Sequence, residues 1–545
     1  MRKFRNTLIA AVAVALLALS FKADNYFEIT KNLDVFSSIF KELNAYYVDD
    51  FKNDDLIEKG VDAMLKSLDP YTSYISEDEI GAFRTQTTGK YGGIGSIIRK
   101  IDDHIVIAEP YFGFPAQKAG LIAGDRVIAV DGKSMKDKST GELSEILRGT
   151  PGTEVEIEIF RPIKNEELKF NLIREEVKVG AVPYYGMLDD NVGYISLRSF
   201  TDNCSKELTA ALNELENENN LKSLVFDLRG NPGGLLNEAV NVSNLFIDKG
   251  KLVVSTKGKV KAWDRYYKTK NTPFNTEIPI VVLTNKSSAS ASEIVAGVLQ
   301  DYDRGVVIGQ NTFGKGLVQT TRSLSYNTKL KITTAKYYVP SGRSIQSVNY
   351  SNGAKSESIS DSLKTSFKTE KGRLVFDGGG VAPDVIVEKF PLHSITTDLV
   401  NKQLAFEYVN QFVANNTSIA NPREFSLSDK DYNDFVEYLK AKDFDYVSSS
   451  ENELTALIEE AEKEGYYNDI EAQLTSLKNN IKHDKNQDLV KHKKEITEFL
   501  EREIVKRYYY QKGAIEAGID EDQEINEALN ILKDPARYNK LLSIQ

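Results

Sequence analysis

The chain has 545 residues, 41% of them hydrophobic and 27% charged, which are ordinary values for a soluble globular protein. This length exceeds what one hydrophobic core normally organises, so we expect several domains. The net charge of −11 disfavours a surface that tracks phosphates, and we expect no nucleic-acid partner. The single cysteine, Cys204, excludes an intramolecular disulfide, and the four scattered histidines form no Cys/His cluster, so we expect no metal site.

The N-terminus has the pattern of an export signal. Basic residues at positions 2, 3 and 5 precede an apolar run from Leu8 to Leu19, which is short for a membrane span and typical of a signal-peptide core. We predict a signal peptide over residues 1–23 and an exported, periplasmic protein. The alternative is an uncleaved segment that tethers the protein to the inner membrane.

Two regions of different character follow. Residues 24–83 are predicted to be helical, because apolar residues recur at helical spacing over 26–47 and a second helical stretch over 54–68 ends at Asp69-Pro70. Residues 84–178 begin with clustered glycines and continue with short runs of strand character, so we predict a small β-rich domain. These runs are 94–98, 104–108, 126–130, 154–160 and 168–173.

Residues 179–390 alternate strand and helix patterns, which predicts an α/β domain whose sheet is covered by helices. Ligands in such folds lie at the carboxyl ends of strands, and both the Gly-Gly turn at 233–234 and a serine cluster at 287–292 occupy such ends. The predicted strands are 192–197, 221–228, 278–283 and 306–308. Three helices are predicted: one over 204–217, one that follows the Gly-Gly turn and ends at 245, and one that follows the serine cluster and ends at 299.

The last predicted regions are a polar loop and a helical extension. Residues 347–377 are rich in Ser, Lys and Asn without a period, which predicts a mobile surface loop. Residues 391–545 are highly charged, and their pattern predicts a mostly helical C-terminal domain. Its expected helices cover 451–464, 469–480, 488–510 and 520–533.

Ser290 is a candidate nucleophile without a local histidine, since none occurs between His104 and His393. It begins a helix directly after an apolar strand, where free N–H groups and the helix dipole stabilise negative charge. The structural alternative is a helix cap, because residues Ser290 to Glu293 fit the capping box S-x-x-E.

Lys315 is the candidate base, since a serine with a lysine base is a known variant of the catalytic triad. Its amine would have to be desolvated to be neutral, and its apolar neighbours make this feasible. Gln319 could orient the amine or the hydroxyl as a third member. Residues 309–315 also match the start of a P-loop, but Gly316 replaces the Ser or Thr that binds magnesium and a strand pattern follows, so we expect no nucleotide.

Two sets of backbone N–H groups complete the candidate site. Those of Ala291 and of Gly233 or Gly234 could hold an oxyanion, although the two glycines could equally form a plain tight turn. The loop Gly92-Gly93-Ile94-Gly95 could hold a peptide carboxylate beside an edge to which the peptide adds as a strand, the alternative being a β-turn.

Taken together in chain order, these segments resemble the C-terminal processing peptidases, or tail-specific proteases, of serine peptidase family S41. The resemblance covers roughly residues 30–390. It rests on LDPYTSY at 68–74, YGGIG at 91–95, FPA at 114–116 with AGL at 119–121, GD at 124–125 and DG at 131–132, DLRGNPGG at 227–234, SASASE at 288–293, GKGLVQ at 314–319, YYVPSGRSIQ at 337–346 and VAPD at 381–384. The stretch 347–377 departs from the family as an insertion, and 391–545 has no assigned catalytic role.

The resemblance implies a multidomain α+β fold: a helical N-terminal region, a PDZ domain, an α/β protease core of crotonase/ClpP-like type and a helical C-terminal extension. It implies Ser290 as nucleophile, Lys315 as general base and Gln319 as orienting residue, with no cofactor. The expected partners are protein substrates bound by their C-termini, with self-association through terminal helices and an adaptor protein as further possibilities. The alternatives are a non-catalytic PDZ-containing binding or chaperone module for unfolded or lipoprotein clients, and an acyl-group enzyme on a similar scaffold.

Overall fold

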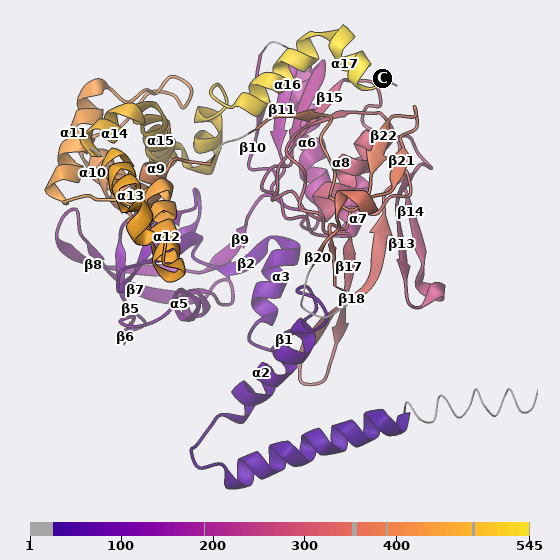
Figure 1. The fold of residues 1–545 in the computed structure, drawn as a ribbon, viewed down its shortest axis with the longest axis horizontal. Helices are drawn as coiled ribbons and strands as arrows, with labels where there is room; N and C mark the ends of the chain where they lie inside the picture. Colours follow the sequence, from indigo (N-terminus) through magenta and orange to yellow (C-terminus); the bar gives the residue numbers. More distant parts are fainter. Residues whose placement is uncertain (1–25, 190, 351–356, 389–390, 482–484, 544–545) are drawn as a thin grey trace, which may run out of the picture. The chain divides into compact units, whose positions relative to one another are not determined.

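The computed structural model describes the chain except residues 1–25, 190, 351–356, 389–390, 482–484 and 544–545 (Figure 1). It divides into two compact units, residues 1–74 and 75–545, which are described separately. The predicted signal segment lies outside the described residues. Among the described helices, none combines the length and the apolar character that crossing a bilayer requires.

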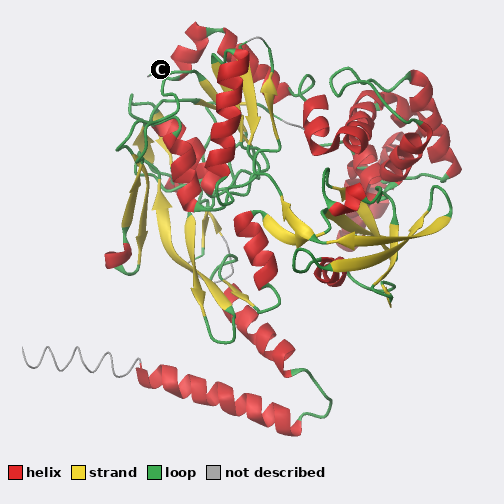
Figure 2. Ribbon diagram, turned by 180° about the vertical axis from the view of Figure 1, so that it is seen from behind, coloured by secondary structure: helices red, strands yellow, loops and turns green. Residues whose placement is uncertain are grey.

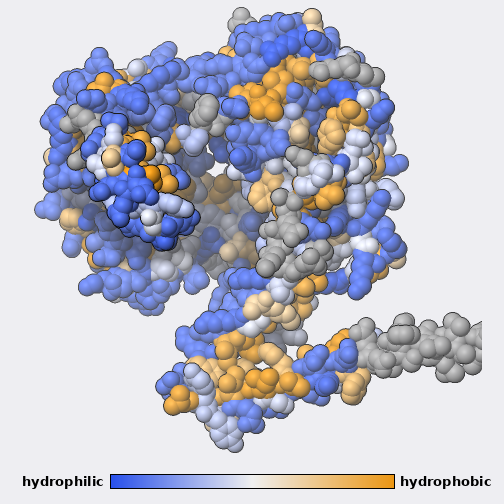
Figure 3. Space-filling model, viewed as in Figure 1, coloured by the Kyte–Doolittle hydropathy of each residue, from blue (hydrophilic) through white to orange (hydrophobic). Residues whose placement is uncertain are grey.

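The first unit is built on two helices, as the apolar spacing predicted. One covers 26–46 and the other is α2 (Asn53–Lys66). Apolar side chains line the first helix but stay exposed, among them Phe27, Leu33 and Phe36. Figure 3 shows hydrophobic surface gathered along the N-terminal helices.

The second unit begins with a short helix and a small β domain. An antiparallel sheet of order β3-β4-β5-β7-β8, with β6 paired to β5, encloses an apolar core beneath α5. β3 pairs only with β4, so it is an edge strand of this sheet, and α5 packs against it. The elements are α3 (Ile80–Thr88), β2 (Lys90–Gly93), β3 (Ser96–Ile101), β4 (His104–Pro110), α4 (Pro115–Lys118), β5 (Arg126–Val130), β6 (Lys133–Ser134), α5 (Thr140–Leu147), β7 (Glu154–Arg161), β8 (Glu166–Ile173) and β9 (Glu175–Lys178).

The central domain is a sheet of order β10-β11-β12-β15-β16-β23, parallel except for β10. Its inner strands β11, β12, β15 and β16 are buried along their whole length, as expected when helices cover both faces. The strands are β10 (Tyr184–Met187), β11 (Val192–Ser196), β12 (Ser223–Asp227), β15 (Ile280–Thr284), β16 (Val306–Gly309) and β23 (Val385–Ile386).

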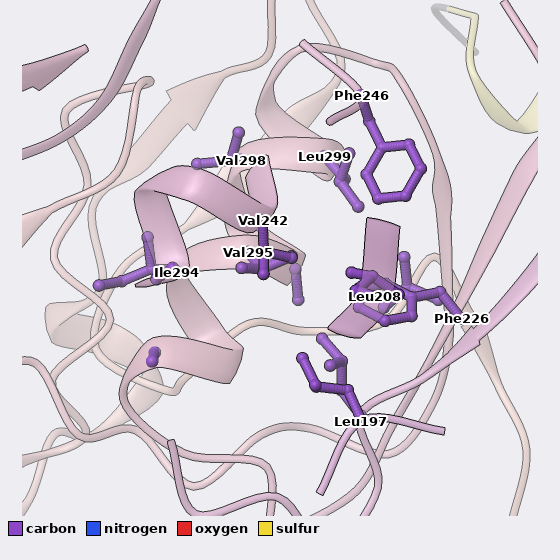
Figure 4. Close-up of a cluster of buried hydrophobic side chains, with 14 of the residues drawn as sticks. Leu197, Leu208, Phe226, Val242, Phe246, Ile294, Val295, Val298 and Leu299 are labelled. Atoms are coloured by element: carbon purple, nitrogen blue, oxygen red, sulfur yellow. The ribbon is translucent and has the colours of Figure 1, made fainter. Parts of the chain in front are cut away.

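Different parts of the chain cover the two faces of this sheet. Helices α6 (Cys204–Asn219), α7 (Leu236–Asn244) and α8 (Ala291–Asp301) bury one face around residues such as Phe226 and Val295 (Figure 4). The other face is covered by α16 (Gln523–Lys533) and α17 (Pro535–Leu541), whose apolar residues join the cluster of the sheet. The last helices of the C-terminal region therefore complete the α/β domain.

A second, antiparallel sheet flanks this domain (Figure 2). It pairs β17 with β18, β18 with β13, and β13 with β14. Sequence patterns predicted only the start of β17. The strands are β13 (Leu252–Gly258), β14 (Arg265–Lys268), β17 (Leu317–Ser323) and β18 (Lys329–Tyr338).

The polar stretch 347–377 was predicted to be a mobile surface loop, but its described residues contain regular structure. They include two short hairpins, and Arg373 fixes the second to the α/β domain through an ion pair with Asp303 at 2.6 Å. The strands are β19 (Val348–Asn349), β20 (Glu357–Ser358), β21 (Ser366–Lys368) and β22 (Leu374–Phe376).

The C-terminal region is helical, as predicted, around its own apolar core. The long helix α15 departs from helical backbone at Tyr510 (φ 57°, ψ −158°), and just before that point Lys506 forms an ion pair with Glu109 of the β domain at 2.8 Å. The helices before α16 are α9 (Ser394–Asn401), α10 (Leu404–Asn415), α11 (Asp429–Ala441), α12 (Ser449–Glu464), α13 (Tyr467–Ile481), α14 (Lys485–Lys491) and α15 (Lys493–Ala517).

Candidate active site

Three loops meet at the carboxyl ends of the neighbouring parallel strands β12, β15 and β16. We call them the oxyanion turn (227–234), the nucleophile loop (285–293) and the base loop (309–316). Because parallel strands end at the same edge of a sheet, residues far apart in the sequence come together here. Backbone bonds join the loops: the N–H of Phe313 donates to the carbonyl of Ser288 at 3.0 Å, and that of Ala289 donates to Asn231 at 3.0 Å.

Ser290 stands at the N-cap of α8 with a backbone conformation that is rare for a residue with a side chain (φ 55°, ψ −109°). Such strain persists only where surrounding contacts fix it. Here the carbonyl of Asn231 accepts from the N–H of Ala289 at 3.0 Å and from the hydroxyl of Ser292 at 2.9 Å, while the hydroxyl of Tyr337 donates to the carbonyl of Ser290 at 3.1 Å. The strained serine is therefore held from both sides.

Glu293 links the nucleophile loop to the base loop. Its Oε2 accepts from the N–H of Ser290 at 2.7 Å and from the N–H of Lys315 at 2.9 Å. Its Oε1 accepts from the hydroxyl of Thr312 and from the N–H of Gly314, both at 2.6 Å. One fully buried carboxyl group therefore brings the backbones of the candidate nucleophile and the candidate base side by side.

The environment of Glu293 also changes its chemistry. Burial raises its pKa to about 7, and the hydrogen bonds that it accepts oppose this rise only in part. Sequence reasoning assigned Glu293 only to the capping box, and its bond to the N–H of Ser290 is one arm of such a box. The donors from the base loop lie 19 to 22 residues further along, so no local pattern revealed this second role.

Lys315 and Gln319 are placed differently. The half-buried Lys315 belongs to the base loop, whose next residue, Gly316, donates its N–H to Gln346 Oε1 at 2.7 Å. Gln319 lies on β17, where the register with β18 shifts between Val318 and Gln319. Its amide donates to Thr333 Oγ1 at 3.1 Å. The structure thus brings Ser290 and the base loop together, while the Gln319 amide bonds to the neighbouring strand.

The predicted oxyanion donors lie beside Ser290. A Cβ atom at Gly233 (φ 95°) would come within 2.6 Å of the Ala289 carbonyl oxygen and 2.8 Å of the Ala291 nitrogen, so only glycine fits. The N–H of Gly233, however, donates to Asn231 Oδ1 at 2.9 Å. As the first residue of α8, Ala291 has no acceptor for its N–H within the helix. In this conformation the N–H of Gly233 is therefore already bonded within the turn, although Gly233 is the glycine that packs against Ser290.

A buried ionic cluster lies at the start of the oxyanion turn. Asp227 accepts from the Tyr194 hydroxyl and from Arg229 Nη2, both at 2.7 Å, and Arg229 Nη1 reaches Asp522 at 2.8 Å and also Glu524. Burial alone would raise the pKa of Asp227, but the attraction and hydrogen bonds of Arg229 hold that pKa below its usual value. This cluster was missed because Asp522 and Glu524 lie in the C-terminal region.

The glycine loop of the β domain is closely packed. Ile94 is buried in the domain core, and a Cβ atom at Gly95 (φ 72°) would lie 2.4 Å from the Phe114 Cβ. Gly92 and Gly93 belong to β2, and the loop leads directly into the edge strand β3. The loop is thus adjacent to an edge at which a strand could be added.

Comparisons with known proteins agree with this architecture. Residues 191–352 match the model of peptidase family S41, and the chain is 37% identical over 341 residues to a "Carboxy-terminal-processing protease" of Bartonella bacilliformis, covering 62% of this chain and 78% of that protein. The chain belongs to peptidase family S41. Residues 106–161 match a PDZ domain and residues 395–532 the "Probable PDZ-protease, C-terminal helical domain". The family resemblance, the peptidase class and the multidomain fold are therefore confirmed.

Further comparisons with this S41 peptidase show a smaller share of the relative's length or a lower identity. A "Probable CtpA-like serine protease" of Staphylococcus aureus is 37% identical over 318 residues, or 58% of this chain and 62% of that protein. A solved "photosystem II D1 C-terminal processing protease" is 27% identical, with a TM-score of 0.35 over 65% of this chain and 92% of that one. The peptide-bound PDZ domain of a Vibrio cholerae carboxy-terminal protease is 21% identical, with a TM-score of 0.16 over 16% of this chain and 99% of that one.

Proposed function

We propose that this S41 peptidase is an exported endopeptidase that cleaves proteins at or near their C-termini. Ser290 acts as nucleophile, Lys315 as general base and Gln319 as orienting residue. The observation that carries this proposal is the double hydrogen bond at Glu293 Oε2, which ties the N–H of Ser290 and the N–H of Lys315 to one oxygen atom. This bond places the candidate nucleophile and the candidate base on adjacent backbone, as a shared catalytic task requires.

The proposed chemistry follows the logic of a serine nucleophile with a lysine base. Neutral Lys315 removes the proton of Ser290 as the oxygen attacks the scissile carbonyl, and the N–H groups of Ala291 and of Gly233 or Gly234 hold the oxyanion. Protonated Lys315 gives its proton to the leaving amine, so an acyl-enzyme forms. Water then loses a proton to Lys315 and attacks the ester, and Lys315 returns that proton to the Ser290 oxygen as the carboxylic acid leaves.

We further propose that the PDZ domain captures substrate C-termini. Its glycine loop leads into the edge strand β3, with α5 packed alongside, and this arrangement suits the addition of a peptide strand. Arg148, at the end of α5, lies 5.1 Å from the centroid of the Tyr91 ring at the loop, so a positive charge is available near a bound carboxylate. Export, an adaptor protein and self-association stay predictions.

The Ser290→Ala variant tests the catalytic proposal. We expect cleavage of an unfolded test protein to fall to the background rate while circular dichroism and thermal melting stay unchanged. Ser287→Ala is the matched control, because Ser287 belongs to the same loop and is exposed. Cleavage by Ser290→Ala at the wild-type rate would falsify the nucleophile assignment.

The Ser290→Ala variant also tests substrate capture. A fluorescent peptide with a free C-terminal carboxylate should bind, and the same peptide with a C-terminal amide should bind at least about tenfold more weakly, since the amide removes the charge that the loop would hold. Equal anisotropy curves for the two peptides would reject capture of C-termini. A wild-type protein that binds the free peptide but never cleaves any substrate would instead support the binding-module alternative.

A further inference from the structure

The C-terminal region reaches the candidate active site through the start of α16. We propose that Asp522 and Glu524 are positioning residues that hold the oxyanion turn through Arg229. Arg229 Nη1 lies 3.0 Å and 2.8 Å from the two carboxylate oxygens of Asp522 and also contacts Glu524. The three side chains are largely shielded, with 12% of Arg229, 17% of Asp522 and 3% of Glu524 exposed. This inference rests on the proposed function, because it assigns a catalytic role to the turn.

Arg229 transmits these contacts to the backbone of the turn. Its Nε and Nη2 bind the carboxylate of Asp227 at 3.0 Å and 2.7 Å, and its own N–H donates to Asp227 Oδ1 at 2.8 Å. The next N–H, of Gly230, donates to Asn285 Oδ1 at 3.0 Å in the nucleophile loop. Because the guanidinium is bonded to carboxylates on both sides, the first residues of the oxyanion turn have little freedom to move. The positions of the glycine N–H groups at the other end of the turn depend on where the turn begins.

Glu524 also lies against the start of the base loop. A Cβ atom at Gly309, where β16 ends, would come within 2.9 Å of Glu524 Oε1 and within 2.3 Å of the Thr284 carbonyl oxygen. Glycine at this position therefore lets the carboxylate approach the edge of the sheet, where the oxyanion turn and the base loop both begin. One helix of the C-terminal region thus contacts the first residues of both the oxyanion turn and the base loop.

Attachment of α16 to the sheet does not require these charges. Ile525, Ala528 and Ile531 already bury the apolar face of the helix in the cluster that it shares with β12, β15 and β16. Desolvating two carboxylates and a guanidinium is costly and often contributes little net stability compared with apolar packing. A fixed orientation of the turn is a benefit that such a buried, directional cluster does supply.

If Asp522 and Glu524 position the oxyanion turn, an enzyme that lacks their charges should lose kcat with little change in KM. An oxyanion donor contributes mainly in the transition state, so a misplaced turn slows the chemical step without weakening substrate binding. A displacement of about 1 Å in such a site can cost roughly 100-fold in rate. A purely structural role would instead lower the amount of folded enzyme and leave the kcat of the folded molecules unchanged.

The double variant Asp522→Asn with Glu524→Gln tests the proposal in the full-length enzyme. Asn keeps the helix cap that Asp522 provides to the N–H groups of Glu524 and Ile525, and both changes are nearly isosteric. The control is Glu527→Gln on the same helix, whose partner is Arg537. We expect kcat to fall roughly 10- to 100-fold in the double variant, with KM within about twofold of wild type, and both parameters to stay unchanged in the control.

Each result decides between the alternatives. A wild-type kcat in the folded double variant, or a loss that follows the fraction of unfolded protein seen by circular dichroism, would overturn the positioning role. If the double variant does not fold, Asp522→Asn alone gives the same comparison, since it retains the cap. Inactive Ser290→Ala together with a fully active double variant rejects this inference only, whereas active Ser290→Ala rejects the proposed function itself.

Discussion

Glu293 and Arg229 are two ionisable groups that organise the candidate active site, and their loss of solvation is compensated in opposite ways. Glu293 has no counter-charge among the donors described for it, which are three backbone N–H groups and one hydroxyl. Arg229 is surrounded by three carboxylates, those of Asp227, Asp522 and Glu524. One group thus depends on neutral hydrogen bonds and the other on ion pairs.

This difference decides whether the charge of each group changes near neutral pH. With only neutral groups among its described hydrogen-bond donors, Glu293 has its pKa raised by burial to about 7, so its charge changes near neutral pH. The pKa of Asp227 is held below its usual value and that of Arg229 well above its own, so these two groups keep their charges near neutral pH. The stability that Asp227 contributes is present above its unfolded pKa and is lost only as the pH falls through its lower folded value. The nucleophile and base side is therefore the pH-sensitive side of the site.

The largest effect on stability is expected from Arg229→Met. Removal of the guanidinium leaves two buried carboxylates and one largely shielded carboxylate without their cation, which costs about 3–5 kcal/mol in the free energy of unfolding. Urea unfolding of the wild type and of Arg229→Met at neutral pH measures this loss in unfolding free energy. Arg537→Met is the control, because the Arg537–Glu527 pair is partly exposed and should be worth less than about 1 kcal/mol. Equal losses in the two variants would contradict the distinction between a buried cluster and a surface pair.

The next effect is the pH dependence that Glu293 imposes. Its pKa is about 7 in the folded chain against 4.5 ordinarily, so between these values the folded state holds a proton that the unfolded state has released. Its contribution to stability is therefore full below pH 4.5 and is lost as the pH rises through 7, a change of about 3 kcal/mol. Glu293→Gln cannot titrate, so the difference in unfolding free energy between wild type and variant should change by that amount from pH 4.5 to 8.

The same variant should alter activity. Above pH 7 the carboxylate accepts all four hydrogen bonds, whereas the amide replaces one acceptor oxygen by an NH₂ group and leaves donors of the two loops unpaired. We expect a lower kcat for Glu293→Gln and a shallower rise of activity between pH 6 and 8 than in wild type. The rise that remains reports groups other than Glu293. Identical pH–rate profiles would show that Glu293 does not titrate in this range.

Local sequence patterns predicted the loops that carry Ser290 and Lys315, but not the ionic cluster around Arg229. The apolar runs that became β12 and β15, and the turn residues that follow them, predicted both the α/β core and the positions of Ser290 and Gly233. Lys315 was found because a short motif surrounds it. Such signals work because a strand, its turn and the next helix are specified by neighbouring residues.

The long-range partners carried no such signal. Arg229 and Asp522 are 293 residues apart, and nothing in either segment identifies the other. The last helices were assigned to a separate charged extension, although they cover one face of the central sheet. The second sheet was mostly missed because most of its strands, such as β18, are only partly buried, so their alternation of polar and apolar residues is weak.

The smallest effect should come from Tyr194→Phe, which removes one neutral donor from the ionic cluster. The Tyr194 hydroxyl donates to Asp227 Oδ2 at 2.7 Å inside the domain, but that oxygen keeps Arg229 as a partner. Loss of such a bond costs about 1 kcal/mol, well below the cost of removing the guanidinium. Urea unfolding and kcat measured on the same preparation test this, with kcat expected within about threefold of wild type because Arg229 still holds the turn. A loss as large as that of Arg229→Met would mean that the phenol, and not the guanidinium, fixes Asp227.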